Sequence, residues 1–468
     1  MDVKDYSAYD ATGLAELIRT GQVSAGQVLD AALESVESAN PGLNAVVSLS
    51  EGQAREAAEA AGRQPAPLGG VPFLIKDLGV NVAGSVTTNG CRLFAGGAPA
   101  AADSEIVARY RRAGLVLMGR TNSPEFGLAP TTEPDLFGPT RNPHDGACSA
   151  GGSSGGAAAA VASGMVPAAH ASDGGGSIRI PASCCGLFGL KPTRGRITFA
   201  PERGEGWAGL STNHAVTRTV RDSAALLDAT AGPAPGDPYW APSAPGSFTA
   251  AARTEPGPLR VGLCTTAPTG VAVDAGCRAA AEATARRLEG LGHHVSEVCW
   301  PVGPALLAAA QAGVVGANVA LAVQARLAEL GRPLIEGDLE PVTAAIIAWG
   351  ERTSAVDYAR AVSAIHQVGR LMGGLFESID VLVTPTLGCP PPRLGEVERA
   401  DVTRFAETVA PLVAFTSVVN MSGQPAMSLP LDRSAGGLPV GTQVIGRFGD
   451  EATLLSLAGQ VERAYPWR

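Results

Sequence analysis

The sequence of 468 residues is poor in charge, and lysine in particular is almost absent. Charged residues make up 17% of the chain, below the roughly 25% typical of soluble proteins. Lysine occurs only at positions 4, 76 and 191, so arginine supplies 32 of the 35 basic residues, and the net charge is −9. A chain without a basic stripe cannot neutralise phosphates. This excludes nucleic acid and an anionic membrane as partners and favours a neutral small molecule.

Spaced metal ligands are also missing. The eight cysteines include no CxxC pair, and we expect them to be reduced core residues. The six histidines are scattered without ligand spacing, at positions 144, 170, 214, 293, 294 and 366. The sequence therefore predicts no metal and no organic cofactor, and it offers no well-placed histidine for a Ser-His-Asp triad.

Apolar runs that would direct the chain to a membrane are few. Residues 1–5 are acidic and no apolar stretch follows them, so no secretion signal is recognisable and we expect a cytoplasmic protein. Residues 301–324 carry no charge and are long enough to span a bilayer. Alanine and glycine dominate them, however, and Gln311, Asn318 and Gln324 interrupt them. We interpret this stretch as a buried or pocket-lining helix.

Helical and strand patterns alternate along the chain. Residues 10–60 carry apolar residues at three- and four-residue spacing, with Thr12 and Ser24 placed as N-caps, and predict helices. The apolar runs 71–80 and 115–120 predict buried strands on either side of a helix at 104–114. A second strand–helix–strand unit and three late strands are expected at 259–265, 274–290, 293–298, 379–386, 424–431 and 439–446. This alternation predicts the α/β class.

We expect one α/β enzyme core. Residues 1–65 form its N-terminal helical layer, residues 66–232 its catalytic part and residues 233–468 its remainder. A surface connection rich in proline, glycine and alanine at 232–257 joins the two parts. Within the remainder, residues of about 300–375 read as a helical insertion placed to wall a pocket.

Lys76 stands at the polar end of the first predicted strand. A lysine in apolar surroundings can lose its proton and act as a base, which an arginine cannot do. Enclosure should lower its pKa toward about 7–8. The plainer interpretation is an ion pair with Asp77. Successive residues of a strand point to opposite faces, however, so we expect the Asp77 side chain to be directed away.

Two adjacent serines lie in the glycine-rich run 151–156, GGSSGG. As composition alone this run is a flexible linker, but it leads directly into an alanine-rich helix predicted at 155–165. A turn held at a helix N-terminus is therefore the better interpretation. Gly151-x-Ser153-x-Gly155 also matches the nucleophile elbow of α/β-hydrolases, which requires a preceding apolar strand. The preceding residues, RNPHDGACSA, do not provide one.

Three glycines precede a third serine in the segment 173–181, DGGGSIRIP. Successive glycines free backbone N–H groups to converge on one point, as an oxyanion hole requires, and Ser177 follows them directly. The alternative is an ordinary glycine loop. A further glycine pattern at 204–209, GEGWAG, matches a dinucleotide fingerprint but lacks the flanking strand and helix that such a site needs.

In this order the motifs IKD, GGSSGG, DGGGSIRIP and GLKPTRGR resemble the amidase signature family, and the spacing of 24 residues between Ser153 and Ser177 agrees with it. The resemblance extends over nearly the whole chain, as far as NMSGQPAMSLP at 420–430. It implies an open, twisted, mixed β-sheet of about eleven strands covered by helices. It also implies a Ser-cisSer-Lys triad of Ser177, Ser153 and Lys76.

The resemblance further implies an oxyanion hole formed by the amides of Gly174, Gly175, Gly176 and Ser177. By the same match, Ser154, Asp173 and Arg179 are supporting residues that hold the turn. The family often has a bulkier residue at the position of Gly174. A glycine there loosens the hole or enlarges the space beside it.

Within the family, IPASCCGLFGLKPTRGR and TTEPDLFGPTRNP are most similar to hydrolases of nylon-type (aminohexanoate) cyclic amide oligomers. The resemblance implies hydrolysis of a neutral amide, with carbamate (urethane) and ester substrates as alternatives, and a possible homodimer. An amidotransferase subunit that is active only in a complex is the remaining alternative. Pocket walls are expected from 126–137, 205–215 and 300–375, with Phe126, Phe137, Trp207 and Trp349 favouring a hydrophobic or aryl group.

Overall fold

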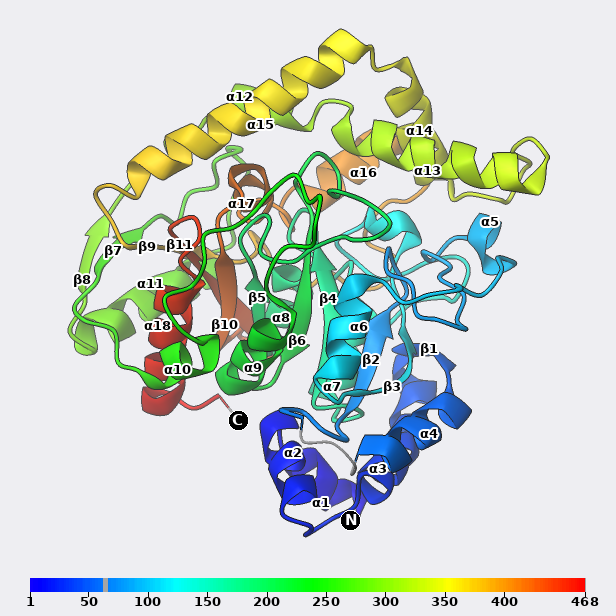
Figure 1. Ribbon diagram of the computed structural model, residues 1–468. Helices are drawn as coiled ribbons and strands as arrows, with labels where there is room; N and C mark the ends of the chain where they lie inside the picture. Colours follow the sequence, from blue (N-terminus) through cyan, green and yellow to red (C-terminus); the bar gives the residue numbers. More distant parts are fainter. Residues whose placement is uncertain (62–65, 468) are drawn as a thin grey trace.

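The computed structural model describes residues 1–61 and 66–467, and an open mixed β-sheet forms its centre (Figure 1). The eleven strands lie in the order β1-β3-β2-β4-β6-β5-β10-β11-β9-β7-β8, which confirms the predicted α/β fold. The strands are β1 Val46–Leu49, β2 Pro72–Lys76, β3 Val116–Thr121, β4 Ala168–Asp173, β5 Phe188–Lys191, β6 Thr212–Thr217, β7 Arg260–Leu263, β8 His294–Glu297, β9 Val381–Pro385, β10 Ala426–Arg433 and β11 Pro439–Gly446.

Helices cover both faces of this sheet (Figure 1). They are α1 Val3–Ala8, α2 Ala11–Arg19, α3 Ala25–Leu43, α4 Glu51–Ala61, α5 Arg92–Ala95, α6 Glu105–Arg112, α7 Gly155–Ala162, α8 Arg179–Cys185, α9 Val220–Thr230, α10 Phe248–Arg253, α11 Ala275–Gly290, α12 Pro304–Gln311, α13 Val314–Leu330, α14 Pro341–Arg352, α15 Ala355–Leu375, α16 Val402–Val409, α17 Ser417–Ser422 and α18 Glu451–Ala464. A 3-10 turn, η1, spans Glu125–Gly127.

The central strands are buried on both faces, which explains their continuous apolar runs. Every residue of β2, β3, β5, β6, β9 and β11 is buried. β2 runs parallel to β3 and β4, whereas β4 runs antiparallel to β6. The carboxyl ends of β2 and β4 therefore meet at one edge, which brings Lys76 close to the residues that end β4.

The N-terminal segment departs from the prediction of helices alone. Residues 46–49 form the edge strand β1, which pairs antiparallel with β3 and was missed because it is only four residues long. Ser24 caps α3 as predicted, but Asp10 and not Thr12 caps α2. Thr12 instead bonds to the buried carboxylate of Asp222. The predicted boundary at 65/66 borders residues 62–65, which lie outside the described residues.

The predicted helical insertion forms α12–α15, which arch over the top of the sheet in Figure 1. Pro304–Leu330 is apolar and long enough, by composition, to cross a bilayer, but less than half of its most apolar window is buried. It is divided into α12 and α13 at Gly313, whose φ is 73°. Three residues of this stretch, Gln311, Val315 and Gly316, line a cavity of about 280 Å³.

Candidate active site

Lys76 ends β2 in a fully buried position between two serine hydroxyls. Its Nζ lies 2.7 Å from Ser153 Oγ and 3.1 Å from Ser172 Oγ. Burial lowers the pKa of Lys76 to about 7, although the Asp173 carboxylate opposes this shift. Just above neutral pH, Lys76 is therefore uncharged in at least half of the molecules. A general base must be in this uncharged form to accept a proton. The sequence prediction did not include Ser172.

Asp77 is directed away from Lys76, as the alternation along a strand predicts. Its carboxylate accepts a hydrogen bond from the Thr88 backbone N–H at 3.0 Å, and the Thr88 hydroxyl also donates to it. Arg120 lies 3.7 Å away. Burial raises the pKa of Asp77, opposed by Arg120 and Thr88. The alternative of a Lys76–Asp77 ion pair is therefore wrong.

The glycine-rich run around Ser153 is a closely packed turn. The Gly152–Ser153 peptide bond is cis. A Cβ at Gly152 would lie 2.6 Å from the carbonyl oxygen of Thr131, so only glycine fits. Ser154 Oγ lies 3.2 Å from the carbonyl oxygen of Ser172, which joins this turn to the end of β4. The run is therefore a held turn and not the flexible linker that its composition alone suggests.

A buried ion pair shapes the turn that carries Ser177. Arg179, at the start of α8, binds both carboxylate oxygens of Asp173, with distances of 2.8 Å and 3.0 Å. The same carboxylate accepts hydrogen bonds from the backbone N–H groups of Gly176 and Ile178. Although burial opposes ionisation, Arg179 holds the pKa of Asp173 well below its usual range. The turn is thus folded around a permanent negative charge.

This arrangement changes the set of amides available for an oxyanion. Gly174, Gly175 and Ser177 border the same cavity as Gln311, Val315 and Gly316. The Gly176 N–H instead donates to Asp173 Oδ1 at 2.8 Å, and Gly176 is not among the residues that line the cavity. The prediction that Gly176 contributes an oxyanion donor therefore needs correction. Motif matching could not detect this, because each glycine in the run looks alike in sequence.

Three side chains from the last quarter of the chain complete the turn. The Thr416 hydroxyl donates to the Gly175 carbonyl oxygen at 2.7 Å. The Asn420 amide donates to both the backbone oxygen and the carboxylate of Asp173. Gln443 accepts from Arg179 at 2.6 Å. Sequence reasoning missed these residues; for Asn420 the only signal was its place at the start of the matching segment 420–430.

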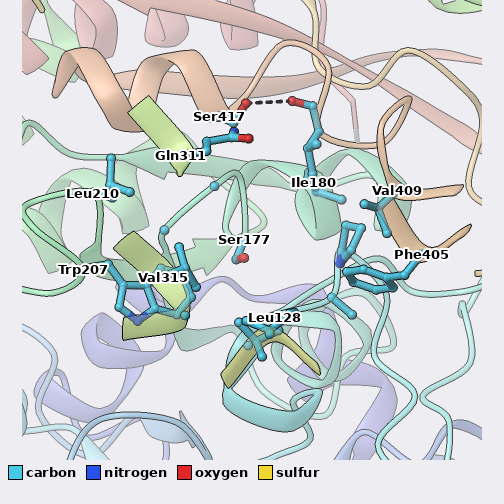
Figure 2. Close-up of a pocket in the computed structure, with 18 of the residues that line it drawn as sticks. Leu128, Ser177, Ile180, Trp207, Leu210, Gln311, Val315, Phe405, Val409 and Ser417 are labelled. Carbon is cyan, nitrogen blue, oxygen red and sulfur yellow. Dashed lines mark hydrogen bonds between the residues drawn. The ribbon is translucent and has the colours of Figure 1, made fainter. Parts of the chain in front are cut away.

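An uncharged cavity of about 280 Å³ opens beside Ser177 (Figure 2). The predicted walls contribute Leu128, Trp207 and Trp349, whereas the predicted Phe126 and Phe137 are not among the lining residues. Phe126 packs edge-on against Phe94 behind the wall. A further wall, not predicted, comes from the C-terminal part of the chain: Phe405, Val409, Val413, Ser417 and Met421. The lining contains no charged side chain.

The comparison with known families agrees with this geometry. A sequence model described as Amidase matches residues 27–455 of the chain. The chain belongs to the amidase family. It is therefore an enzyme that acts on amide carbon–nitrogen bonds.

This amidase resembles characterised relatives over almost its full length. A 6-aminohexanoate-cyclic-dimer hydrolase of Paenarthrobacter ureafaciens is 38% identical over 98% of this chain and 95% of that one. A solved structure of 6-aminohexanoate cyclic dimer hydrolase matches with a TM-score of 0.93 at 37% identity, covering 98% of both chains. A bacterial aryl acylamidase of the amidase signature family matches with a TM-score of 0.89 at 31% identity, covering 98% and 96%. The predicted family resemblance is confirmed.

Two alternatives for the chemistry of this amidase lack support. Residues 141–149 form isolated bridges and no strand, so the nucleophile elbow at Ser153 lacks the element that must precede it. Within residues 1–61 and 66–467, no histidine hydrogen-bonds to Ser153 or Ser177. Burial lowers the pKa of His170 to about 3 and that of His214 to about 4, so both are neutral near pH 7.

Proposed function

We propose that this amidase hydrolyses neutral, apolar amides through an acyl-enzyme formed on Ser177. The contact of 2.7 Å between Lys76 Nζ and Ser153 Oγ, fully enclosed beside an uncharged cavity that Ser177 borders, is the observation that supports it most directly. A buried neutral lysine next to a serine is a proton acceptor that needs neither histidine nor metal.

In the first half-reaction, Ser177 Oγ attacks the amide carbonyl carbon while its proton passes to Ser153 Oγ and the Ser153 proton passes to Lys76 Nζ. The carbonyl oxygen gains the negative charge and accepts hydrogen bonds from the backbone amides at Gly174, Gly175 and Ser177. The proton then returns through Ser153 to the leaving nitrogen. The C–N bond breaks, and the amine departs.

In the second half-reaction, water attacks the ester carbonyl of acyl-Ser177. Ser153 and Lys76 again accept its proton and then return one to Ser177 Oγ as the acid leaves. The supporting ion pair of Asp173 and Arg179 keeps the oxyanion amides in place throughout. No charge has to enter the cavity except the transient one on the oxygen.

The substrate class follows from the lining of the cavity. A free carboxylate or ammonium group would have no counter-charge there, so its desolvation would not be compensated. Trp207, Trp349 and Phe405 offer aromatic surface for a hydrophobic or aryl group. Two of the similar proteins are named for such substrates: one is a hydrolase of the 6-aminohexanoate cyclic dimer, and the other is an aryl acylamidase. Aryl carbamates and esters present an equivalent carbonyl and are the second class to test.

Labelling with a small fluorophosphonate probe tests the nucleophile. Ser177→Ala should lose both labelling and turnover, because it lacks the oxygen that becomes acylated. Ser378→Ala, which alters an exposed serine on the surface, should be labelled like the wild type. Full labelling of Ser177→Ala would refute the assignment. A panel of aryl amides, cyclic amides, carbamates and esters then ranks the substrate classes.

A further inference from the structure

The glycine-rich segment 204–209, GEGWAG, lies in the long connection between β5, which ends at Lys191, and β6, which begins at Thr212. No helix follows it, so the dinucleotide pattern has no structural counterpart. Trp207 and Ala208 both adopt a φ of 52°, a left-handed conformation that is unusual for residues with a side chain. Backbone conformations of this kind persist where the surroundings hold them. The backbone at Trp207 is therefore held in this conformation by the residues around it.

The Trp207 indole rests against Gly174, the first glycine of the Ser177 turn. A Cβ at Gly174 would lie 2.7 Å from Cζ3 and 2.8 Å from Cε3 of the indole. These distances are too short for any side chain, so the indole, together with the Ser211 hydroxyl at 2.9 Å, occupies the space that a larger residue at 174 would fill. At Gly175, by contrast, a Cβ would meet no atom within 4 Å. The close contact is thus specific to one glycine.

The loop and the Ser177 turn are also held by a common side chain. The Asn420 amide donates to the Leu210 carbonyl oxygen at 3.0 Å as well as to Asp173. Arg194 Nε donates to the carbonyl oxygen of the adjacent residue, Gly209, at 2.6 Å. Two side chains therefore hold the backbone directly after Trp207. Figure 2 shows Trp207 on the wall of the cavity that Ser177 borders.

We propose that Trp207 is a specificity-determining residue of this amidase, seated on Gly174 to narrow the cavity beside the oxyanion amides. This inference rests on the proposed role of Ser177. A rigid aromatic wall next to the reacting carbonyl admits planar or unbranched groups and rejects amides that are branched near the carbonyl or the nitrogen. The same contact supports the turn at Gly174, against which the indole packs.

A double-mutant cycle on the purified full-length enzyme tests the contact, with an aryl amide as substrate. Gly174→Ala should lower kcat/KM about tenfold in the wild type but by a clearly smaller factor in Trp207→Ala, because residues in contact are coupled and only the Ser211 hydroxyl, 2.9 Å from a Cβ at Gly174, then stays close. The Gly174 φ lies outside the left-handed region, so alanine suits its backbone. Trp349→Ala is the matched control. It also removes a cavity tryptophan, but Trp349 is not among the atoms nearest to Gly174, so the tenfold loss should persist.

Substrate selectivity gives the readout that a purely structural role would not change. Trp207→Ala should raise kcat/KM for branched amides relative to unbranched ones by at least about tenfold, the order expected for one or two methyl groups in a tight pocket. Trp207→Phe, which keeps a flat ring, should stay close to the wild-type ratio. Thermal unfolding of each variant shows whether it is folded.

The outcomes separate this inference from the proposed function. Labelled Ser177→Ala would refute the nucleophile itself, whatever Trp207 does. If Ser177 is the labelled residue but the Gly174 and Trp207 effects are additive, the proposed contact has no functional role. An unchanged selectivity ratio in Trp207→Ala, for branching on either side of the amide, would likewise overturn the role of Trp207.

Discussion

Two lysines are fully buried in this amidase, and methionine variants of both should show which one controls activity. Burial lowers the pKa of Lys76 and of Lys191 to about 7. Lys76 lies between Ser153 and Ser172, whereas Lys191 Nζ donates to the Pro192 carbonyl oxygen. The two therefore share a titration range but not a role. Only Lys76→Met should remove the dependence of activity on pH.

Both the activity and the stability of the wild type should rise with pH, for different reasons and over different pH ranges. Activity needs neutral Lys76, so it should fall about tenfold per pH unit below the pKa and level off above it. Stability rises because the unfolded lysine, with its pKa of 10.5, binds a proton that the folded one has lost above about pH 7. Below that pH the destabilisation is complete, and above 10.5 it disappears.

The magnitude follows from the same shift. The fall in the pKa of Lys76 from 10.5 to about 7 corresponds to about 5 kcal/mol between the two protonation states. Between about pH 7 and about pH 9, the free energy of unfolding of the wild type should therefore rise by about 2 kcal/mol relative to Lys76→Met. Lys191→Met should show a similar stability difference while it keeps the wild-type activity profile.

The assay is the second-order rate of fluorophosphonate labelling, measured from about pH 5.5 to 9, with urea unfolding at the same pH values. Glu340 needs a control, because burial raises the pKa of its carboxyl to about 7 and it directly precedes α14, whose residues Ile346 and Trp349 line the cavity. Glu340→Gln should retain the rise in labelling near pH 7. If that rise persists in Lys76→Met, or disappears in Lys191→Met or Glu340→Gln, the assignment of Lys76 as the base is refuted.

Two further predictions concern the relay and the turn. Lys76→Ala should lower amide hydrolysis by several orders of magnitude but activated ester hydrolysis by much less, because only the amine leaving group needs a proton; equal losses in kcat would contradict the relay. Asp173→Ala should destabilise the fold by about 3–5 kcal/mol in urea unfolding, because it leaves Arg179 buried without its counter-charge. Asp30→Ala, which breaks an exposed pair with Arg55, is the control and should leave stability nearly unchanged; equal effects of the two variants would show that burial is not decisive.

The sequence alone determined the local features of this protein. Continuous apolar runs located β2 and β3, since a strand that is buried on both faces needs apolar side chains on both. The scarcity of lysine made Lys76 conspicuous. The alternation of side chains along a strand correctly predicted that Asp77 points away from it. The order and spacing of the glycine motifs indicated the family, because tight turns leave few alternatives to glycine.

Tertiary structure decided the contacts between distant segments. Ser172 reaches Lys76 only because β2 and β4 are neighbours in the sheet, and no local pattern encodes that pairing. The same holds for Asn420, which meets Asp173 across 247 residues. The position of Trp207 against Gly174, within the glycine-rich segment 204–209, is likewise visible only in the folded structure. A sequence specifies which conformations each segment favours, whereas these contacts depend on how the sheet brings the segments together.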